Sequence, residues 1–307
     1  RIDCPPSAWG VTLFQAASAA CPAKSKQRFT LFAFLIPDSY SYVQNDNNLT
    51  SEARMILDAF TLAGKVAMVT GCDTGLGQGM AIALAEAGCD IVGVNRKVPD
   101  ETAARVTALG RRFIAIRADL GKQESIQSVV DTAVAEMGRI DILVNNAGTI
   151  RRADALEFSE KDWDEVIDLN LKSVFFLSQA VAKQFIAQGQ GGKIINIASM
   201  LSFQGGIRVP SYTASKSGVL GLTRLLANEW ATLGINVNAI APGYMVTNNT
   251  RQLRDDEQRS QAILDRIPAG RWGLPEDLQG PVVFLASRAS DYVNGHTLAV
   301  DGGWLAR

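Results

Sequence analysis

From residue 61 onward, short apolar runs alternate along the chain with longer amphipathic segments. Most of the short runs are rich in β-branched residues and do not alternate with polar positions, which indicates strands buried on both faces. We expect seven strands, at residues 66–70, 91–94, 113–118, 142–144, 193–197, 236–240 and 297–300. We expect helices between most of them, at residues 77–87, 122–137, 161–187 and 211–233. A further helix is expected at residues 253–266, either as a mobile substrate lid or as a simple connection.

Strands that alternate with helices are typical of βαβ units, which form a parallel sheet covered by helices on both faces. The regular pattern occupies residues 55–307 and contains no internal repeat of solenoid period. The sequence therefore predicts an α/β fold in a single domain, with a doubly wound sheet of about seven parallel strands.

The first 54 residues do not share this pattern. They contain Pro5-Pro6, a basic cluster around Lys24 and Arg28, and a short apolar run at residues 29–36. A basic flank before an apolar run resembles a signal peptide, but this run is short, starts late and has no convincing cleavage site after it. We interpret residues 1–54 as an extension outside the fold, with Met55 as the natural start; a targeting segment is the alternative.

Composition narrows the functional classes. The net charge of −1 shows no basic excess for nucleic acid, and no apolar stretch is long enough to span a membrane. The four cysteines are scattered along the chain, which favours reduced thiols in a cytoplasmic protein over a disulfide framework. Because His296 is the only histidine, neither a transition-metal site nor a His-based triad is expected. We therefore expect a small-molecule partner and no metal.

A glycine-rich turn follows the first expected strand. Gly71, Gly75 and Gly77 have the spacing G-x-x-x-G-x-G, and a helix follows. Glycines permit the tight turn and the close approach of backbone N–H groups to a pyrophosphate, which the helix N-terminus also attracts. The alternative is an ordinary strand–helix loop, but its place in the first βαβ unit favours a dinucleotide.

The end of the second strand bears on the choice between NAD and NADP. An acidic residue there binds the ribose 2′-hydroxyl, whereas a nearby arginine accommodates a 2′-phosphate. Here the residues are Asn95, Arg96 and Lys97. The missing carboxylate and the two cations favour NADP, unless Arg96 and Lys97 simply face water.

Tyr212 and Lys216 form the most informative pair. On a helix, residues four apart lie on one face, so the ammonium is expected beside the phenol. Lowering a phenol pKa from about 10 to 7 takes about 4 kcal/mol, which a cation about 4 Å away supplies at a dielectric of about 20. The pair is therefore a candidate general acid/base. Alone, this pattern also occurs by chance on surface helices.

Other polar residues are expected at the same edge of the sheet. Ser199 follows the fifth strand, at the carboxyl edge where doubly wound sheets bind ligands. Asn146 lies in an Asn-Asn-Ala-Gly turn after the fourth strand, suited to close approach of a ribose. Asn170 lies in the long helix that follows, where a buried amide needs a partner in backbone or water.

These residues together resemble the short-chain dehydrogenase/reductase family over residues 55–307. The resemblance implies a Rossmann-like sheet, hydride transfer and a homotetramer. It implies that Tyr212 exchanges the substrate proton, Lys216 lowers its pKa and binds the ribose, and Ser199 holds the substrate oxygen. Asn170 would anchor a water that relays the proton. The residues expected to contact the cofactor are Gly71, Asp73, Gly75, Leu76, Gly77, Asn95, Asp119, Leu120, Asn146, Tyr212, Lys216, Met245 and Thr247.

Four stretches, residues 71–75, 145–163, 199–216 and 267–275, resemble a subgroup that reduces keto-deoxy sugar acids from pectin-derived uronates, usually with NADH. NAD(H) is therefore expected, although Arg96 departs from the subgroup and keeps NADP(H) open. A sugar acid carries a carboxylate, which arginine binds well. Arg151, Arg152 and Arg208 are the candidates, with a surface or interface role as the alternative.

Two other functions share the motifs. A 3-ketoacyl carrier-protein reductase would use NADPH and need a basic docking patch. A dinucleotide-sensing regulator would need no catalytic residues, whereas all four positions are filled here. The apolar circumference of the helices at 166–186 and 219–233 is explained either by subunit contacts or by ordinary core packing.

Overall fold

The computed structural model describes residues 55–307, so the interpretation of residues 1–54 lies outside the described part. The described residues form one parallel sheet with the strand order β3-β2-β1-β4-β5-β6-β7. The strands are β1 (Val66–Thr70), β2 (Asp90–Asn95), β3 (Phe113–Arg117), β4 (Ile142–Asn145), β5 (Gly192–Ile197), β6 (Ile235–Pro242) and β7 (Thr297–Val300). The order reverses direction between β1 and β4, where a doubly wound sheet opens its ligand crevice. The predicted fold class is confirmed.

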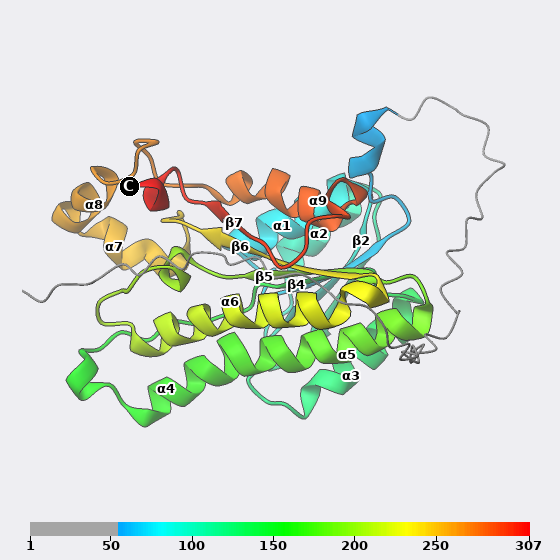
Figure 1. Ribbon diagram of the computed structural model, residues 1–307, viewed down its shortest axis with the longest axis horizontal. Coiled ribbons are helices and arrows are strands. Elements are labelled where there is room, and N and C mark those ends of the chain that lie inside the picture. Colours follow the sequence, from blue (N-terminus) through cyan, green and yellow to red (C-terminus); the bar gives the residue numbers. More distant parts are fainter. Residues whose placement is uncertain (1–54) are drawn as a thin grey trace, which may run out of the picture. The chain divides into compact units, whose positions relative to one another are not determined.

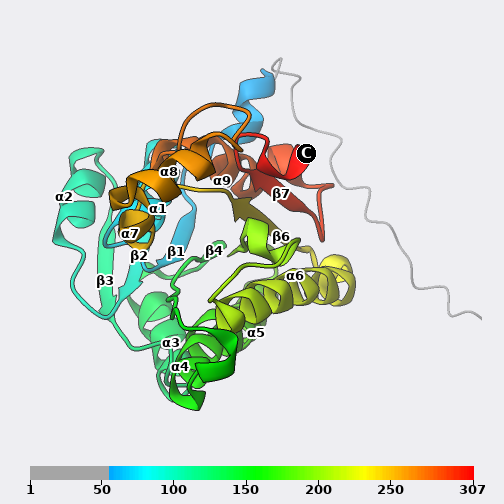
Figure 2. The same cartoon turned by 90° about the vertical axis from the view of Figure 1, so that its left-hand side faces the viewer.

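Helices cover both faces of the sheet (Figure 1, Figure 2). The helices are α1 (Gly75–Glu86), α2 (Asp100–Ala108), α3 (Ser125–Met137), α4 (Glu160–Ile167), α5 (Ser173–Gln188), α6 (Pro210–Trp230), α7 (Arg251–Asp255), α8 (Glu257–Leu264) and α9 (Gln279–Ala286). On one face, Met80 of α1 and Val282 of α9 pack on the sheet. On the other, Phe185 of α5 and Leu226 of α6 do so. Truncating a fully buried phenylalanine such as Phe185 costs about 3–5 kcal/mol.

The expected helices did not include α2 and α9, and two of the expected helices differ from those observed. The long helix expected at 161–187 is interrupted by a π-helical turn, Asp168–Lys172, between α4 and α5. The expectation of a single helix at 253–266 is wrong, because the structure has two short helices, α7 and α8, in this segment. The helix breaks at Asp256, whose φ of −91° and ψ of 103° are not helical. The Asp256 carboxylate accepts a hydrogen bond from the Arg259 N–H at 2.9 Å and so starts a separate helix, α8.

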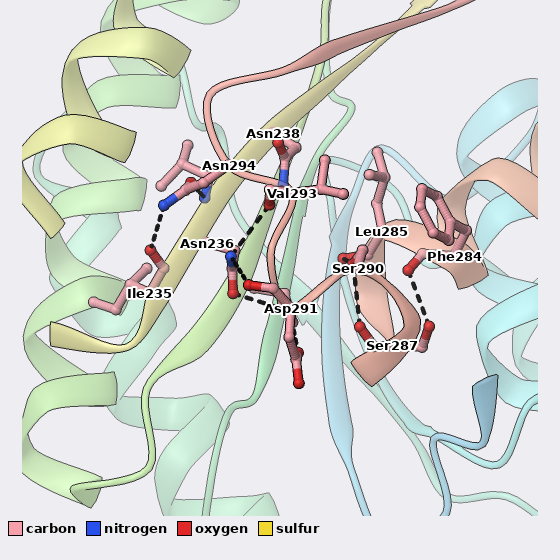
Figure 3. A network of polar contacts seen from close by, with 12 residues as sticks. Ile235, Asn236, Asn238, Phe284, Leu285, Ser287, Ser290, Asp291, Val293 and Asn294 are labelled. Atoms are coloured by element: carbon pink, nitrogen blue, oxygen red, sulfur yellow. Dashed lines mark hydrogen bonds and ion pairs between the residues drawn. The ribbon is translucent and has the colours of Figure 1, made fainter. Parts of the chain in front are cut away.

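A polar network holds the amino ends of β6 and β7 together (Figure 3). The Asn236 amide donates to the carbonyls of Asp291 and Val293, at 3.0 and 3.2 Å. The Asn238 amide donates to the Val293 carbonyl at 2.8 Å. Asn294 Oδ1 accepts from the Val237 N–H at 2.8 Å. These bonds anchor the loop before β7 and thereby fix the last strand at the edge of the sheet.

A second network lies at the amino ends of β1 and β4. Asp141, whose side chain is 7% exposed, accepts from the Val66 N–H at 2.9 Å and from Arg139 Nε at 2.8 Å. Lys65 adds a contact at 3.3 Å. The carboxylate thus links two central strands and has its charge balanced by two cations.

Within residues 55–307, no helix is both long and apolar enough to cross a membrane. The same residues contain no group of three or more His, Cys, Asp or Glu side chains arranged to hold a metal ion.

Candidate active site

A cavity of about 480 Å³ opens at the carboxyl edge of the sheet, and residues that follow each of the strands β1 to β6 line it. The short helices α7 and α8 lie at this edge (Figure 1, Figure 2). Every residue expected to contact the cofactor lines this one cavity, and so does Ser199. The topology therefore brings together residues that lie far apart in the sequence.

The glycine loop leaves no room for side chains where the chain folds back on itself. Gly71 has a φ of +64°, and a Cβ at Gly77 would lie 2.1 Å from the Gly71 carbonyl oxygen. Asn146 Nδ2 donates to the carbonyls of Thr70 and Gly71, at 2.9 and 2.8 Å, and fastens the loop to the turn after β4. Helix α1 then begins at Gly75, so its partial positive charge faces the cavity. This arrangement fits a pyrophosphate.

The end of β2 carries an unpaired acceptor. Asn95 is 6% exposed, lines the cavity, and donates its Nδ2 to Cys72 Sγ at 3.4 Å. Its Oδ1 is buried and has no hydrogen-bond partner among the described residues. A buried acceptor without a donor is costly, and a ribose hydroxyl supplies the missing donor. Arg96 and Lys97, both exposed, line the cavity beside it. The residues present therefore fit a nicotinamide dinucleotide.

Tyr212, Ser199 and Lys216 meet at the inner part of the same cavity. Ser199 and Lys216 are 7% and 5% exposed. Tyr212 and Lys216 lie in the first turns of α6, and the Lys216 Nζ is 5.7 Å from the centre of the Tyr212 ring. That Nζ donates to the Ile197 carbonyl at 2.6 Å, which ties α6 to the end of β5.

The acid–base properties of this pair differ from the sequence-based expectation. Burial raises the pKa of Tyr212, while the hydrogen bond with Ser199 and the charge of Arg152 act in the opposite direction. Burial also lowers the pKa of Lys216 to about 8. The expected lowering of the Tyr212 pKa is therefore wrong for the protein alone. The ammonium bonds a carbonyl instead of the phenol, and desolvation penalises the phenolate.

Asn170 lies fully buried in the π-helical turn, behind the cavity wall. Its Oδ1 accepts from the Thr149 N–H at 2.8 Å, and its Nδ2 donates to the Thr149 carbonyl at 2.9 Å and to Ser215 Oγ at 3.3 Å. Ser215 Oγ in turn donates to the Tyr212 carbonyl at 2.8 Å. The Asn170 side chain thus binds the loop after β4 to the helix that carries Tyr212.

The three candidate arginines have different surroundings, and none of them lines the cavity wall. Arg151 is held by Glu165, with Nε 3.1 Å from Oε2, and lies near Asp162. Arg208 is 62% exposed and pairs with Asp154 at 3.2 Å. Arg152 donates to the Asn249 carbonyl at 2.9 Å and acts electrostatically on Tyr212.

Thr70 is a site residue that the sequence analysis did not single out. Its Oγ1 accepts from the N–H groups of Asn146 and Ala147, both at 2.9 Å, and donates to the Val144 carbonyl at 3.3 Å. It therefore shapes the turn after β4 from the end of β1. Its signal in the sequence is its place directly before the glycine loop, as the first residue of the family pattern T-G-x-x-x-G-x-G. Asn248, Asn249 and Thr250, which precede α7, also line the cavity.

Comparison with known proteins identifies relatives of this fold and site. Residues 71–305 match a family model described as enoyl-(acyl carrier protein) reductase. The chain is 78% identical over 253 residues to the 2-dehydro-3-deoxy-D-gluconate 5-dehydrogenase of Escherichia coli (strain K12), which covers 82% of this chain and 100% of that protein.

Solved structures agree. A 2-deoxy-D-gluconate 3-dehydrogenase from Agrobacterium tumefaciens, so described, with bound NADP, is 58% identical, with a TM-score of 0.78 over 81% of this chain and 100% of that one. A gluconate 5-dehydrogenase from Burkholderia cenocepacia in complex with NADP and tartrate is 42% identical, with a TM-score of 0.79 over 82% and 100%. With these relatives, this sheet and this cavity, the chain belongs to the short-chain dehydrogenase/reductase family.

Proposed function

We propose that the protein reduces the 5-ketone of a 2,5-diketo-3-deoxy-gluconate-type acid to 2-keto-3-deoxy-gluconate, using NAD(H), in the breakdown of pectin-derived uronates. One observation carries the proposal: Ser199, Tyr212 and Lys216 share a cavity with a dinucleotide loop, in a chain 78% identical to a protein named 2-dehydro-3-deoxy-D-gluconate 5-dehydrogenase. The names of the relatives supply the substrate class, and the site supplies the chemistry.

The bound NADH would supply a hydride to the substrate carbon. Tyr212 Oη would donate a proton to the carbonyl oxygen, and Ser199 Oγ would hold that oxygen by a hydrogen bond. A phenol whose pKa is raised by burial carries its proton at neutral pH and is ready to donate it. Lys216 would bind the ribose and stabilise the phenolate that remains after the transfer. Asn170 would keep the loop after β4 in register with α6, and we propose that it anchors the relay water.

Arg152 is the arginine that we propose for the substrate carboxylate. Its charge reaches Tyr212, and among the described residues its hydrogen bond goes to a backbone carbonyl and not to a carboxylate. Arg151 and Arg208 are neutralised by acidic neighbours and serve as matched controls. We expect Arg152→Ala to raise the KM for the keto acid about tenfold or more, and Arg151→Ala and Arg208→Ala to change it less. Equal effects of all three substitutions would contradict the assignment.

The experiment that tests the function follows nicotinamide absorbance with NADH and NADPH separately. The substrates are a 2,5-diketo-3-deoxy hexonate, 5-keto-gluconate and an acetoacetyl thioester. Turnover of the diketo acid with NADH at the highest kcat/KM supports the proposal. Turnover of the thioester alone, with NADPH, would instead indicate a 3-ketoacyl carrier-protein reductase. The description of the matching family, which names an acyl carrier protein, is consistent with that alternative. Cofactor binding without any turnover would indicate a dinucleotide-sensing regulator.

We propose a cytoplasmic homotetramer. Support comes from large apolar side chains exposed on adjacent helices of one layer: Phe176 and Ile186 of α5 and Leu225 of α6 are 38%, 51% and 46% exposed (Figure 1). Such side chains are typical of subunit contacts. Light scattering coupled to gel filtration measures the mass in solution, and a monomer at micromolar concentration would contradict the proposal.

A further inference from the structure

The amide of Asn95 is held in one orientation by a cysteine. Cys72 lies in the glycine loop, is fully buried, and accepts the Asn95 Nδ2 hydrogen bond at 3.4 Å. Because Nδ2 points to the thiol, the amide presents Oδ1 as its free end, and that atom is the buried acceptor without a partner. A rotation of the amide by half a turn would present the donor instead.

The surroundings also fix the backbone that carries the thiol. The Cys72 carbonyl accepts from the Thr102 hydroxyl of α2 at 2.7 Å, and that hydroxyl accepts from Gln78 Nε2 at 3.1 Å. Gly93 of β2 provides the space: a Cβ there would lie 2.8 Å from Cys72 Sγ and 3.4 Å from Asn95 Nδ2. The contact between thiol and amide is therefore built into the loop, α2 and β2 together.

We propose that Cys72 is a positioning residue that fixes Asn95 Oδ1 as an acceptor for the adenosine ribose 2′-hydroxyl, and so favours NAD(H) over NADP(H). The inference rests on the proposed use of NAD(H). A 2′-hydroxyl donates a hydrogen bond to Oδ1, whereas an ionised 2′-phosphate offers only acceptors and would be repelled by it. With the thiol removed, the amide is free to turn its Nδ2 towards a phosphate, and discrimination falls.

The thiol acts as a packed acceptor and not as a nucleophile. Burial raises the pKa of Cys72 to about 11, so the group is an uncharged thiol at neutral pH. Cys89 provides a matched control because it is also a free, fully buried cysteine, and it packs in the core at the start of β2 without lining the cavity.

The test measures dissociation constants of NADH and NADPH by fluorescence, without substrate, for the full-length wild-type protein and for Cys72→Ala, Cys72→Ser and Cys89→Ala. Thermal melts check folding. We expect Cys72→Ala to weaken NADH binding about five- to tenfold while NADPH binding stays equal or improves. Cys72→Ser restores an acceptor and should recover part of the preference. Cys89→Ala should leave the NADH/NADPH ratio unchanged even though it also removes a buried thiol.

The possible outcomes distinguish a failure of the Cys72 inference from a failure of the NAD(H) assignment. A wild-type protein that prefers NADH, with the same ratio in Cys72→Ala within twofold, would overturn this inference and leave the proposed function intact. A wild-type protein that binds NADPH more tightly would overturn the inference together with the NAD(H) assignment, while sugar-acid turnover would still be measured by the assay above. An equal shift of the ratio in Cys89→Ala would also overturn it, because the effect would then belong to core packing.

Discussion

The two ends of the sheet differ in how completely their buried polar side chains are paired. At the amino ends, the charge of Asp141 is paired with cations. The amides of the asparagines around β6 and β7 also have partners (Figure 3). Among the described residues, buried polar atoms without a partner are found on Asn95, Gln123, Ser211, Thr213, Arg254, Thr297 and Trp304. Asn95 is the last residue of β2, and Gln123 follows β3. Ser211 and Thr213 lie in the first turn of α6, Arg254 lies in α7, and Trp304 follows β7, whereas Thr297 begins β7.

The difference separates stability from function within one fold. Satisfied networks join strands that are distant in sequence and contribute to the free energy of unfolding. Unsatisfied groups and a buried ammonium lower that free energy. Of these residues, Asn95 lines the cavity, where a bound ligand would supply the missing partner. Substitutions at the amino ends should therefore change stability with little effect on catalysis, and substitutions at the carboxyl ends should do the reverse.

The largest effect is expected for Tyr212→Phe. It removes the only atom proposed to donate the proton, so kcat should fall by about two to four orders of magnitude. The melting temperature should change little, because the hydroxyl lines the cavity and the ring stays in place. Steady-state kinetics and calorimetry measure both. Tyr292→Phe is the control, since that side chain is fully exposed. Retention of more than a tenth of the activity in Tyr212→Phe would break the assignment.

Asp141→Ala tests the opposite end. It leaves the buried Val66 N–H without its acceptor, whereas Arg139 and Lys65 are 32% and 46% exposed and can be solvated, so the free energy of unfolding should fall by about 1–3 kcal/mol. Urea denaturation measures this loss. The exposed Asp131 of α3, bonded to Gln127, is a control whose alanine variant should change stability by less than about 0.5 kcal/mol. If the folded Asp141→Ala protein also lost most of its kcat, the separation between the two ends would be wrong.

The same contrast explains what the sequence could predict. Strand β1 was located residue for residue, because an apolar run buried on both faces leaves a local pattern. The edge strand β7 was also located residue for residue, although its residues are only partly buried. The glycine loop and Tyr212 were located because their chemistry needs a fixed spacing. The Asp141 network leaves no such pattern, since Lys65 and Asp141 are 76 residues apart.

Tertiary surroundings decided the remaining questions. Arg151 and Arg152 are neighbours in sequence, yet only the structure shows that Glu165 occupies the first. The pKa of Tyr212 depends on burial, which the spacing of Tyr212 and Lys216 does not reveal. The break at Asp256 reflects a cap that outweighs helical periodicity.

Lys216→Met should show the cost of a buried cation. The pKa of Lys216 is about 8 in the fold, against an ordinary value of 10.5. The unfolded chain therefore takes up a proton between these pH values, and this group makes stability rise as pH increases from about 8 to 10.5. At pH 7 the methionine variant should be more stable by about 1–2 kcal/mol, with little turnover. Denaturation at several pH values should show that this advantage shrinks above pH 8. A stability advantage that is constant with pH would contradict this prediction. So would an equal effect of Lys183→Met, which replaces an exposed lysine of α5.

Asn236→Ala is expected to have the smallest effect on stability. It gives the most stringent test of the difference between the two ends of the sheet. The substitution removes two bonds to backbone carbonyls of the loop before β7, at 3.0 and 3.2 Å, and the contact of Lys193 Nζ with Asn236 Oδ1 at 2.9 Å. The affected groups are partly exposed, so water replaces some of these bonds and the loss should be about 1–2 kcal/mol. Because β7 lies at the sheet edge, hydrogen exchange should increase first in residues 291–300, while kcat/KM at 25 °C stays unchanged. Gln127→Ala, which removes an amide from the exposed surface of α3, should leave both measurements unaltered. Faster exchange throughout β1 and β4 would show that the two amino-end networks form one cooperative unit.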